Sequence, residues 1–516
     1  MIEQKPYCWR VPRPPGHLKI GLISKNAAIS YPNKEIIDAT TGEHRPYKEV
    51  DDRSNRIANS LLNCYKPGDF IGVIVRMGID ILEIYFAAAK SGLVIIPISF
   101  RLAPKEIENI LKYAEAKALI FDGRFKPLVD QINLQLEKYV IGESVSDCLN
   151  YDTLLRGDSK EPDIELTDDT IVALGFTSGT TGTPKAYLRT HYANFLNHVT
   201  YAISFDMTCQ DIVLNMVPPL TGLSFDCGAM LVKGSVINQD FDPVGILKTI
   251  EKYKVTFLYG VPAMFSFIMN VPDFDKYDLS SLRAVGSVGA VLPRPTLEKI
   301  WEKMTPNLYD HLGMQETGFI AVSKPDMKRA NPDFVGPPTC LHEIRIVDEQ
   351  GRAKAVGEIG EVIFRFPDGA GEYWKNEAKT KEAFRNGWFY SGDLGKLDQN
   401  GHIAIVGRLK DMIVSGGYNV FAADVEEQVL KHPKIIDCAV IGLPDETWGE
   451  KVVAVVKLKP GETCTEKELV DFCKERMAHY KAPKSVFFDD VLRTPTGKAV
   501  KFAMVEKYKG SAQLFE

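Results

Sequence analysis

A run of small hydroxyl residues and glycines, closed by one lysine, is the part of the sequence best suited to bind an anion. Glycines let backbone N–H groups point at an anion at close range, hydroxyls donate short hydrogen bonds to phosphate oxygens, and lysine adds a mobile positive charge. The preceding residues, Ile171 to Phe176, are predicted to form a buried strand, so the run follows a strand end. It lacks the spacing of a P-loop. Phosphate binding and an ordinary surface loop are both consistent with this composition. The run comprises Thr177, Ser178, Gly179, Thr180, Thr181, Gly182, Thr183, Pro184 and Lys185.

Three charged residues elsewhere would complete such a site. Glu316 follows a predicted strand, and Mg²⁺ is typically held by one or two protein carboxylates together with phosphates and waters. Asp393 lies in a Gly-Asp turn and can accept hydrogen bonds from ribose hydroxyls, as carboxylates do in dinucleotide sites. Lys498 lies near the end of the sequence. Each also has a simpler explanation: a solvated glutamate, a β-turn aspartate and a solvated lysine.

Together these segments resemble the motifs of the adenylate-forming superfamily, which includes acyl-CoA synthetases, the adenylation domains of peptide synthetases and beetle luciferase. Residues 177–185 match its signature loop at nine positions, although Ala186 stands where a glycine is usual. Residues 309–317 resemble its Tyr-Gly-x-Thr-Glu motif, with Leu312 in place of the tyrosine and Gln315 in place of the threonine. Further motifs follow in the superfamily's order along almost the whole chain.

The resemblance implies how the chain would bind ATP and catalyse the first step. A carboxylate attacks the α-phosphate of ATP and pyrophosphate leaves, so catalysis depends mostly on positioning and charge neutralisation. Glu316, with Thr177, would hold Mg²⁺. Asp393 would bind the ribose, and Arg408 the ribose or a phosphate. Lys185 and Lys498 would be catalytic, and Lys498 would bridge the carboxylate and the α-phosphate. Beside the signature loop, the implied ATP- or AMP-binding residues are Gly289, Ala290, His311, Leu312, Gly313 and Gln315.

The resemblance places the acyl pocket among residues 215–231, 259–265 and 285–290. Many acyl-CoA synthetases have Pro-Leu-Phe-His here, and this chain lacks that histidine. Asp226 is flanked by apolar residues on a predicted helix, where a carboxylate is costly to bury without a partner. Three explanations stay open: a helix cap or solvent-facing group, recognition of a substrate amino group as in amino-acid-adenylating enzymes, and other polar recognition. The predicted pocket residues are Leu220, Thr221, Phe225, Asp226, Val261 and Gly289.

Length, composition and periodicity predict an α/β protein of more than one domain. The chain has 516 residues, more than one hydrophobic core normally serves. Its net charge of −6 gives no sign of a nucleic-acid partner. Nine scattered cysteines without a CxxC pair argue against a disulfide framework or zinc site and for a reducing cytoplasm. The N-terminus lacks an apolar signal region, and the apolar segment from Ile81 to Phe100 is broken by charges, glycine and proline, so no membrane span is expected.

The order of the predicted elements indicates how the domains are built. Helices and strands alternate over the first 170 residues and again from about 171 to 312, which predicts two parallel-sheet α/β subdomains. Short apolar runs between Gly-rich turns from 335 to 406 predict a mostly antiparallel β-rich subdomain. We expect an N-terminal core of residues 1–408 and a small mobile α+β domain of residues 409–516. The resemblance makes Lys410 the hinge between them, and Gly416 and Gly417 part of the channel for the pantetheine arm of CoA.

The resemblance implies an ATP-dependent acid–thiol ligase that forms acyl-AMP and transfers the acyl group to coenzyme A. ATP, Mg²⁺ and CoA are the expected cofactors, and a monomer or homodimer is expected. The alternative is a freestanding adenylation enzyme that loads an amino or β-amino acid onto the phosphopantetheine of a carrier protein in trans. A nucleotide-binding relic without activity is disfavoured, because such a protein has no reason to keep all of the charged groups together. These groups are Lys185, Glu316, Asp393, Arg408 and Lys498.

Overall fold

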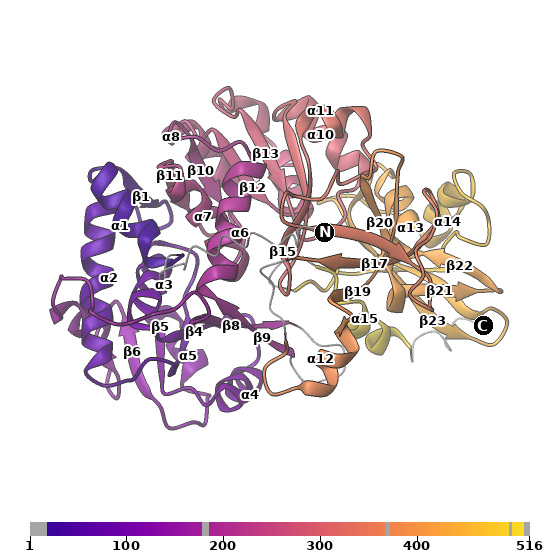
Figure 1. Cartoon of the computed structure of the whole chain (residues 1–516). Coiled ribbons are helices and arrows are strands. Elements are labelled where there is room, and N and C mark those ends of the chain that lie inside the picture. Colours follow the sequence, from indigo (N-terminus) through magenta and orange to yellow (C-terminus); the bar gives the residue numbers. More distant parts are fainter. Residues whose placement is uncertain (1–17, 178–184, 367–371, 495–497, 510–516) are drawn as a thin grey trace, which may run out of the picture.

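The computed structural model describes residues 18–177, 185–366, 372–494 and 498–509, and it contains four β-sheets with helices packed around them. Figure 1 shows the indigo and purple N-terminal elements at one end of the molecule and the yellow C-terminal elements at the other. The predicted α/β class and the antiparallel region in the second half are confirmed.

The first sheet has seven strands in the order β7-β6-β5-β3-β4-β8-β9, and all of its pairings are parallel except that of β8 with β9. Apolar runs rich in valine and isoleucine form its central strands, because such residues suit a sheet covered on both faces. The strands are β3 (Phe70–Ile74), β4 (Val94–Pro97), β5 (Ala118–Asp122), β6 (Glu137–Ile141), β7 (Leu149–Asn150), β8 (Ile171–Thr177) and β9 (Lys185–Thr190). The associated helices are α1 (Gly21–Ser30), α2 (Tyr47–Leu62), α3 (Ile79–Ser91), α4 (Pro104–Ala114) and α5 (Lys126–Val129).

The second sheet has eight strands in the order β15-β14-β13-β12-β10-β11-β1-β2, with antiparallel pairs only at its two edges. Its strands are β1 (Glu35–Asp38), β2 (Glu43–Pro46), β10 (Ile212–Asn215), β11 (Ser235–Asn238), β12 (Phe257–Gly260), β13 (Ala284–Ser287), β14 (Leu308–Met314) and β15 (Gly318–Ser323). Its helices are α6 (His191–Ser204), α7 (Pro219–Leu231), α8 (Pro243–Tyr253), α9 (Pro262–Met269), α10 (Arg294–Lys303) and α11 (Pro325–Ala330).

The strands are not divided between the two sheets in sequence order. The hairpin of β1 and β2 lies at the edge of the second sheet, whereas β8 and β9 complete the first. Hydrophobic periodicity identifies each strand from the residues within it and beside it in the chain. Which sheet the strand joins depends on its pairing with strands that are far away in the sequence. One hydrophobic core therefore spans the space between the sheets, and it contains Val73 and Ile95 of the first sheet together with Val213 and Val236 of the second.

The second half of the chain forms two smaller sheets. The β-rich subdomain contains β16 (Glu343–Val347), β17 (Gly360–Arg365), β18 (Phe384–Arg385), β19 (Trp388–Leu397) and β20 (Ile403–Arg408), with helix α12 (Glu377–Ala383). The C-terminal unit contains β21 (Met412–Ser415), β22 (Tyr418–Phe421), β23 (Ile435–Asp445), β24 (Gly449–Leu458) and β25 (Ser485–Phe488), with helices α13 (Ala422–Leu430), α14 (Glu466–Lys474) and α15 (Lys501–Tyr508). A single 3₁₀ turn, Leu409–Asp411, joins the two sheets, at the position predicted for the hinge.

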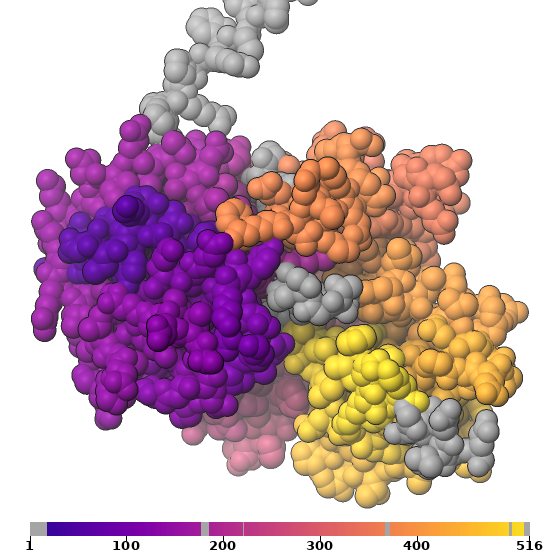
Figure 2. All heavy atoms as spheres, turned by 90° about the horizontal axis from the view of Figure 1, so that it is seen from below, coloured from indigo at the N-terminus to yellow at the C-terminus, as the bar shows by residue number. Residues whose placement is uncertain are grey.

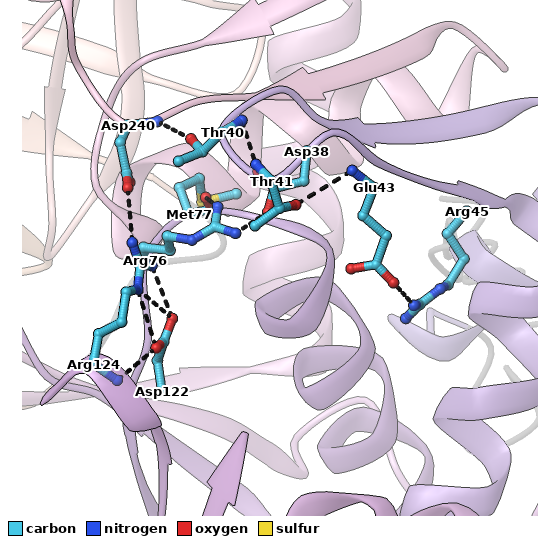
Figure 3. Close-up of polar contacts among 10 residues, drawn as sticks. All are labelled: Asp38, Thr40, Thr41, Glu43, Arg45, Arg76, Met77, Asp122, Arg124 and Asp240. Atoms are coloured by element: carbon cyan, nitrogen blue, oxygen red, sulfur yellow. Dashed lines mark hydrogen bonds and ion pairs between the residues drawn. The ribbon is translucent and has the colours of Figure 1, made fainter. Parts of the chain in front are cut away.

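Charged side chains connect the first two sheets where their strands end (Figure 3). Arg76, after β3, forms a buried ion pair with Asp38 at the end of β1. Arg124, after β5, pairs with Asp122 at 2.8 Å and with Asp240, after β11, at 3.4 Å. We call these five residues the inter-sheet ion-pair cluster. Because a buried charge left without its partner is strongly destabilising, the pair of Arg76 and Asp38 fixes the relative position of the two sheets.

None of the helices in the described ranges is both long and apolar enough to span a lipid bilayer.

Candidate active site

A cavity of about 1160 Å³ lies where the two α/β sheets, the β-rich subdomain and the C-terminal unit meet. Figure 2 shows the yellow C-terminal unit beside the violet N-terminal elements, although these segments are hundreds of residues apart in the sequence. Eleven of the predicted site residues line this cavity, namely Lys185, Thr221, Val261, Gly289, His311, Gly313, Gln315, Glu316, Arg408, Lys410 and Lys498.

The predicted phosphate-binding run begins and ends on neighbouring strands. Thr177 is the last residue of β8 and Lys185 the first of β9, and the two are paired across the antiparallel ladder. Lys185 lies at the edge of the cavity, with its Nζ 5.1 Å from the centre of the Tyr373 ring, within the range of a cation–π contact. Ser178, Gly179, Thr180, Thr181 and Gly182 lie outside the described residues, and the side chain of Thr177 is likewise not described.

Gln315 and Glu316 are held at the cavity wall by residues from two other segments, strand β9 and the segment that contains Tyr373. The Tyr373 hydroxyl donates to Oε1 of Glu316 at 3.1 Å, and the Tyr187 hydroxyl donates to Oε1 of Gln315 at 3.1 Å. Arg189 donates to the backbone carbonyl of Gln315 at 2.6 Å. Because the amide oxygen of Gln315 accepts from tyrosine, its Nε2 is the group that can donate to a phosphate oxygen. A carboxylate that lines the cavity has lone pairs beyond the one used by Tyr373, so Glu316 fits a role as an Mg²⁺ ligand.

Asp393 and Arg408 form an ion pair on neighbouring strands of the β-rich subdomain. Oδ1 of Asp393 lies 2.9 Å from Nε of Arg408, and the two residues are directly paired between β19 and β20. Burial raises the pKa of the Asp393 carboxyl, while the positive charges of Arg408 and Lys498 act in the opposite direction. Asp393 does not itself line the cavity, and its contact with Arg408 places it beside the wall.

Lys498 reaches the cavity from the C-terminal unit. Its backbone N–H donates to Oγ1 of Thr494 at 3.1 Å, and the Thr494 N–H donates to its carbonyl at 2.7 Å, so Thr494 and Lys498 are held side by side. Desolvation by the surrounding protein and the nearby Arg408 lower the pKa of the Lys498 ammonium, whereas the carboxylates of Asp393 and Glu316 raise it. The charges of Glu316, Asp393 and Arg408, which the sequence places far from Lys498, therefore act on it in a single site.

Lys410 lies in the 3₁₀ turn between the β-rich subdomain and the C-terminal unit and lines the same cavity. Desolvation and the positive charge of Arg408 lower the pKa of its ammonium. Gly416 and Gly417 occupy the turn between β21 and β22 with φ of +58° and +83°, a left-handed conformation that favours glycine. They do not line the cavity, so the pantetheine channel and the hinge stay predictions.

Leu312 and Ala290 also lie away from the cavity wall. His311 and Gly313 line the cavity, and side chains alternate along a strand, so Leu312 between them faces the opposite side of β14. There it packs against the core of the β-rich subdomain. Ala290 is exposed and is not among the lining residues.

The structure does not bring Phe225 and Asp226 to the cavity. Both residues are fully buried and neither lines the cavity, whereas Thr221, Leu223 and Ser224 of the same helix do. The ring of Phe225 stacks on that of Tyr259, with the ring centres 4.2 Å apart. The residues that flank these two in the sequence do not show which side chains of the helix point toward the cavity. The side chain of Leu220 lies outside the described part of the structure.

The carboxylate of Asp226 accepts hydrogen bonds from two buried asparagines. In the described residues it does not cap a helix, face solvent or line the cavity. Nδ2 of Asn215 donates to its Oδ1 and Nδ2 of Asn238 donates to its Oδ2, each at 2.9 Å. Burial raises the pKa of the carboxyl to about 7, although both hydrogen bonds favour the charged form. Asp226 thus connects α7 to strands β10 and β11 and has no access to a substrate amino group in this structure.

The raised pKa of Asp226 predicts a pH-dependent contribution to stability. The unfolded chain loses this proton near its ordinary value of 3.8, whereas the folded chain retains it until about pH 7. Between these values the folded state binds more protons, so the contribution falls as pH rises. Asp226→Asn should remove this dependence. The difference in Tm between variant and wild type, measured by thermal unfolding, should move by several degrees in favour of the variant between pH 5 and pH 7.5. A difference that is constant with pH would contradict the assignment.

The structure adds a group of cavity residues that sequence reasoning missed. Asn194, Asn197, His198 and Tyr201 of α6 line the cavity together with Tyr85 of α3 and Ser224 of α7. All six are buried. The spacing of the four α6 residues, at i, i+3, i+4 and i+7, places them on one helical face. This polar stripe on a buried face of the helix was a readable signal that α6 lines a cavity.

Comparisons with known proteins agree with this geometry. The sequence profile of the AMP-binding enzyme family matches residues 24–374, and that of the AMP-binding enzyme C-terminal domain matches residues 424–498. A long-chain-fatty-acid–CoA ligase of Mycobacterium tuberculosis is 30% identical over 504 residues, covering 95% of this chain and 98% of that protein. A feruloyl-CoA synthase of Amycolatopsis is 32% identical over 464 residues, covering 88% and 92%.

A similar solved structure is that of an anthranilate CoA ligase in complex with anthranoyl-AMP. It superposes with a TM-score of 0.89 at 25% identity and covers 96% of this chain and 98% of that one. The match extends over both the N-terminal sheets and the C-terminal unit. Two family profiles match this chain in order, and charged groups of the superfamily motifs lie together at one cavity. This chain therefore belongs to the AMP-binding enzyme family of the adenylate-forming superfamily.

Proposed function

We propose that the protein is an ATP-dependent acid–thiol ligase that converts a carboxylic acid to its acyl-adenylate and transfers the acyl group to coenzyme A. The observation that carries the proposal is the position of Lys498. This lysine from the C-terminal unit lies at the same cavity as Glu316 and Arg408, where its ammonium experiences the charges of Glu316 and Asp393. A cation delivered to that point suits a reaction in which two anions must meet.

In the first step, an oxygen of the substrate carboxylate attacks the α-phosphorus of ATP. The bond from that phosphorus to the bridging oxygen of the β-phosphate breaks, and pyrophosphate leaves with the electron pair. Lys498 would lie between the carboxylate and the α-phosphate and reduce their repulsion, and Lys185 would neutralise the leaving phosphates. Asp393 and Arg408 would hold the ribose end, so that the α-phosphate is fixed relative to the acid. When bound at Glu316, Mg²⁺ supplies further neutralisation of phosphate charge.

In the second step, the sulfur of the thiol attacks the acyl carbonyl carbon, the acyl–phosphate bond breaks and AMP leaves. A turn that brings Gly416 and Gly417 to the cavity would provide a narrow channel without side chains for the pantetheine arm. The 3₁₀ turn that contains Lys410 is the single covalent connection between the sheet of the β-rich subdomain and the sheet of the C-terminal unit. We propose that the C-terminal unit rotates about this turn between the two steps.

Coenzyme A is the favoured acceptor because the three similar proteins reported above are named as CoA ligases or a CoA synthase. The Mycobacterium protein is named for long-chain fatty acids, the Amycolatopsis protein for ferulate and the superposed structure for anthranilate. These acids share a carboxylate and differ in the rest of the molecule, so the relatives support the reaction and leave the identity of the acid to be measured.

The deciding experiment measures pyrophosphate release with ATP and Mg²⁺ over a panel of aliphatic, aromatic and amino acids. Each active acid is then tested with coenzyme A and with a carrier protein bearing phosphopantetheine. The proposal expects magnesium-dependent release of pyrophosphate and formation of acyl-CoA. Transfer to the carrier protein alone would favour the adenylation enzyme that loads a carrier in trans. A complete absence of pyrophosphate release across the panel would overturn both.

Glu316→Gln tests the proposed magnesium ligand. The variant keeps the size of the side chain and an oxygen for the Tyr373 hydroxyl, but it loses the charge that attracts a hard cation. We expect the Mg²⁺ concentration for half-maximal pyrophosphate release to rise roughly tenfold. Glu377→Gln is the matched control, since Glu377 pairs with Lys381 on the exposed face of α12. An unchanged magnesium dependence in Glu316→Gln would remove the assignment.

A further inference from the structure

Arg189 is a buried arginine that lines the cavity and has no carboxylate partner among the described residues. It lies on β9 and is 7% exposed. Buried arginines are normally paired, because a buried charge without a counter-charge is costly. Of the two other buried arginines in the described ranges, Arg45 pairs with Glu83 at 2.6 Å. The second, Arg76, pairs with Asp38. No residue that the structure describes forms an ion pair with Arg189.

The guanidinium of Arg189 makes one hydrogen bond and keeps two nitrogens for a ligand. Nη2 donates to the backbone carbonyl of Gln315 at 2.6 Å, and within the described part of the chain this is the only hydrogen bond of the side chain. Neither Nε nor Nη1 is fully enclosed, unlike Nε of Arg76, which is enclosed and has no partner in the described residues. Both nitrogens of Arg189 therefore keep accessible surface, and the cavity is the space that this residue lines. A guanidinium stays protonated in proteins, so these groups are always donors.

The guanidinium lies against the wall of the cavity that α6 forms. A β-carbon at Gly318 would lie 3.7 Å from Nη1 of Arg189, so this glycine leaves the space beside the guanidinium open. Burial lowers the pKa of His198 to about 3, and the positive charge of Arg189 acts in the same direction. Burial raises the pKa of Tyr201 to about 12, and Arg189 opposes that shift. Both residues belong to α6 and line the cavity, and α6 contains no acidic residue that could balance the charge.

The same wall adjoins both the reactive groups and an apolar part of the cavity. Arg189 holds the carbonyl of Gln315, the residue before the proposed Mg²⁺ ligand. Nδ2 of Asn197, on α6, donates to Oγ of Ser224 on α7 at 2.9 Å, and Leu223 beside Ser224 lines the cavity. An apolar wall suits the carbon skeleton of an acid better than a polyphosphate. An anion at this wall is thus better supplied by the acid than by ATP.

We propose that Arg189 binds a carboxylate of the acid substrate, which supplies the counter-charge that the protein itself does not. The carboxylate is either the one that reacts with ATP or a second one on a dicarboxylic acid, and both present the same group to the guanidinium. Hydrogen bonds between an arginine and a carboxylate are charge-assisted and therefore strong. This inference rests on the proposed acid activation and adds the residue that attracts the acid to its pocket.

The test measures the KM for the acid and the KM for ATP in Arg189→Met, using pyrophosphate release with chain-matched monocarboxylic and dicarboxylic acids. The KM for the acid should rise roughly 10- to 100-fold, while the KM for ATP stays within about twofold of that of the wild type. Arg189→Lys keeps a charge without the planar guanidinium and should give an intermediate KM. Arg329→Met is the matched control. Among the described residues, Arg329 likewise donates only to a backbone carbonyl and lies over an aromatic ring, and it does not line the cavity.

The pattern over the acids identifies the carboxylate. A rise in KM with every acid assigns the reacting carboxylate to Arg189. A rise confined to dicarboxylic acids, together with a wild-type preference for them, assigns the second carboxylate. A role limited to holding the backbone of Gln315 would instead raise the KM for ATP, because Gln315 and Glu316 face the phosphates and Mg²⁺ in the proposed reaction.

The Tm of each variant establishes that it is folded, and Arg189→Lys carries the comparison if Arg189→Met does not fold. An unchanged KM for every acid, or a loss confined to the KM for ATP, would overturn this inference and leave acid activation intact. Absence of pyrophosphate release by the wild type with every acid would instead overturn the proposed function.

Discussion

Lys498→Ala is expected to lower the rate of acyl-adenylate formation by roughly 10²- to 10³-fold, the loss typical of removing one preorganised charge-stabilising group from an active site. The physical reason is that this ammonium lies near the carboxylates of Glu316 and Asp393 at the cavity. Without it, the negative acid would approach the α-phosphate with less neutralisation. Pyrophosphate release in single-turnover reactions measures this step directly.

The same variant should still transfer the acyl group from a synthetic acyl-adenylate to coenzyme A at a rate close to that of the wild type. In that step the lysine is not required, because the two anions have already been joined. Lys501→Ala is the matched control: Lys501 begins α15, pairs with Glu426 at 2.8 Å and does not line the cavity. Equal damage to both steps in Lys498→Ala would remove the proposed role.

Asp393→Ala is expected to weaken ATP binding by roughly 100-fold, since each hydrogen bond to a charged group contributes about 1.5–3 kcal/mol and a carboxylate can accept two from a ribose. The substitution also leaves Arg408 without its partner at 2.9 Å. The affinity for ATP, measured by calorimetry or by the KM in pyrophosphate release, reports the effect.

Asp393→Asn provides the comparison that separates charge from shape. It keeps one acceptor oxygen and nearly the same volume, so its affinity for ATP should lie between those of the wild type and Asp393→Ala. The Tm of both variants establishes that the β-rich subdomain is folded. An affinity for ATP that is the same in all three proteins would contradict the ribose contact.

Local patterns in the sequence predicted the individual elements well, because hydrophobic periodicity is a short-range property. The strand predicted from Ile171 to Phe176 is β8, Ile171–Thr177, and the mostly antiparallel region predicted from 335 to 406 contains the antiparallel strands β16 to β19. The distribution of strands between the two sheets was not predictable in this way. β1 pairs with β11, about 200 residues away, and no local pattern encodes that contact.

The candidate site shows the same division between local and long-range information. Lys185, Glu316, Arg408 and Lys498 could be identified because each belongs to a short motif, and the structure brings them to one cavity. Asp226 was predicted as a pocket residue but is hydrogen-bonded to Asn215 and Asn238, which come from two other elements that its local sequence does not reveal. His198 was missed, although its helical spacing places it on one face with Asn194, Asn197 and Tyr201.

The inter-sheet ion-pair cluster has a consequence for how the enzyme can change its choice of acid. Arg76 and Asp240 line the cavity, but Arg76 is held by Asp38, which does not. The distance between the opposing walls is thus set partly by a residue that no bound molecule touches. Shortening or lengthening the side chain at position 38 would alter the room available to an acyl tail while every contacting residue stays the same. A substitution at a residue that does not line the cavity can therefore change which acids the enzyme accepts.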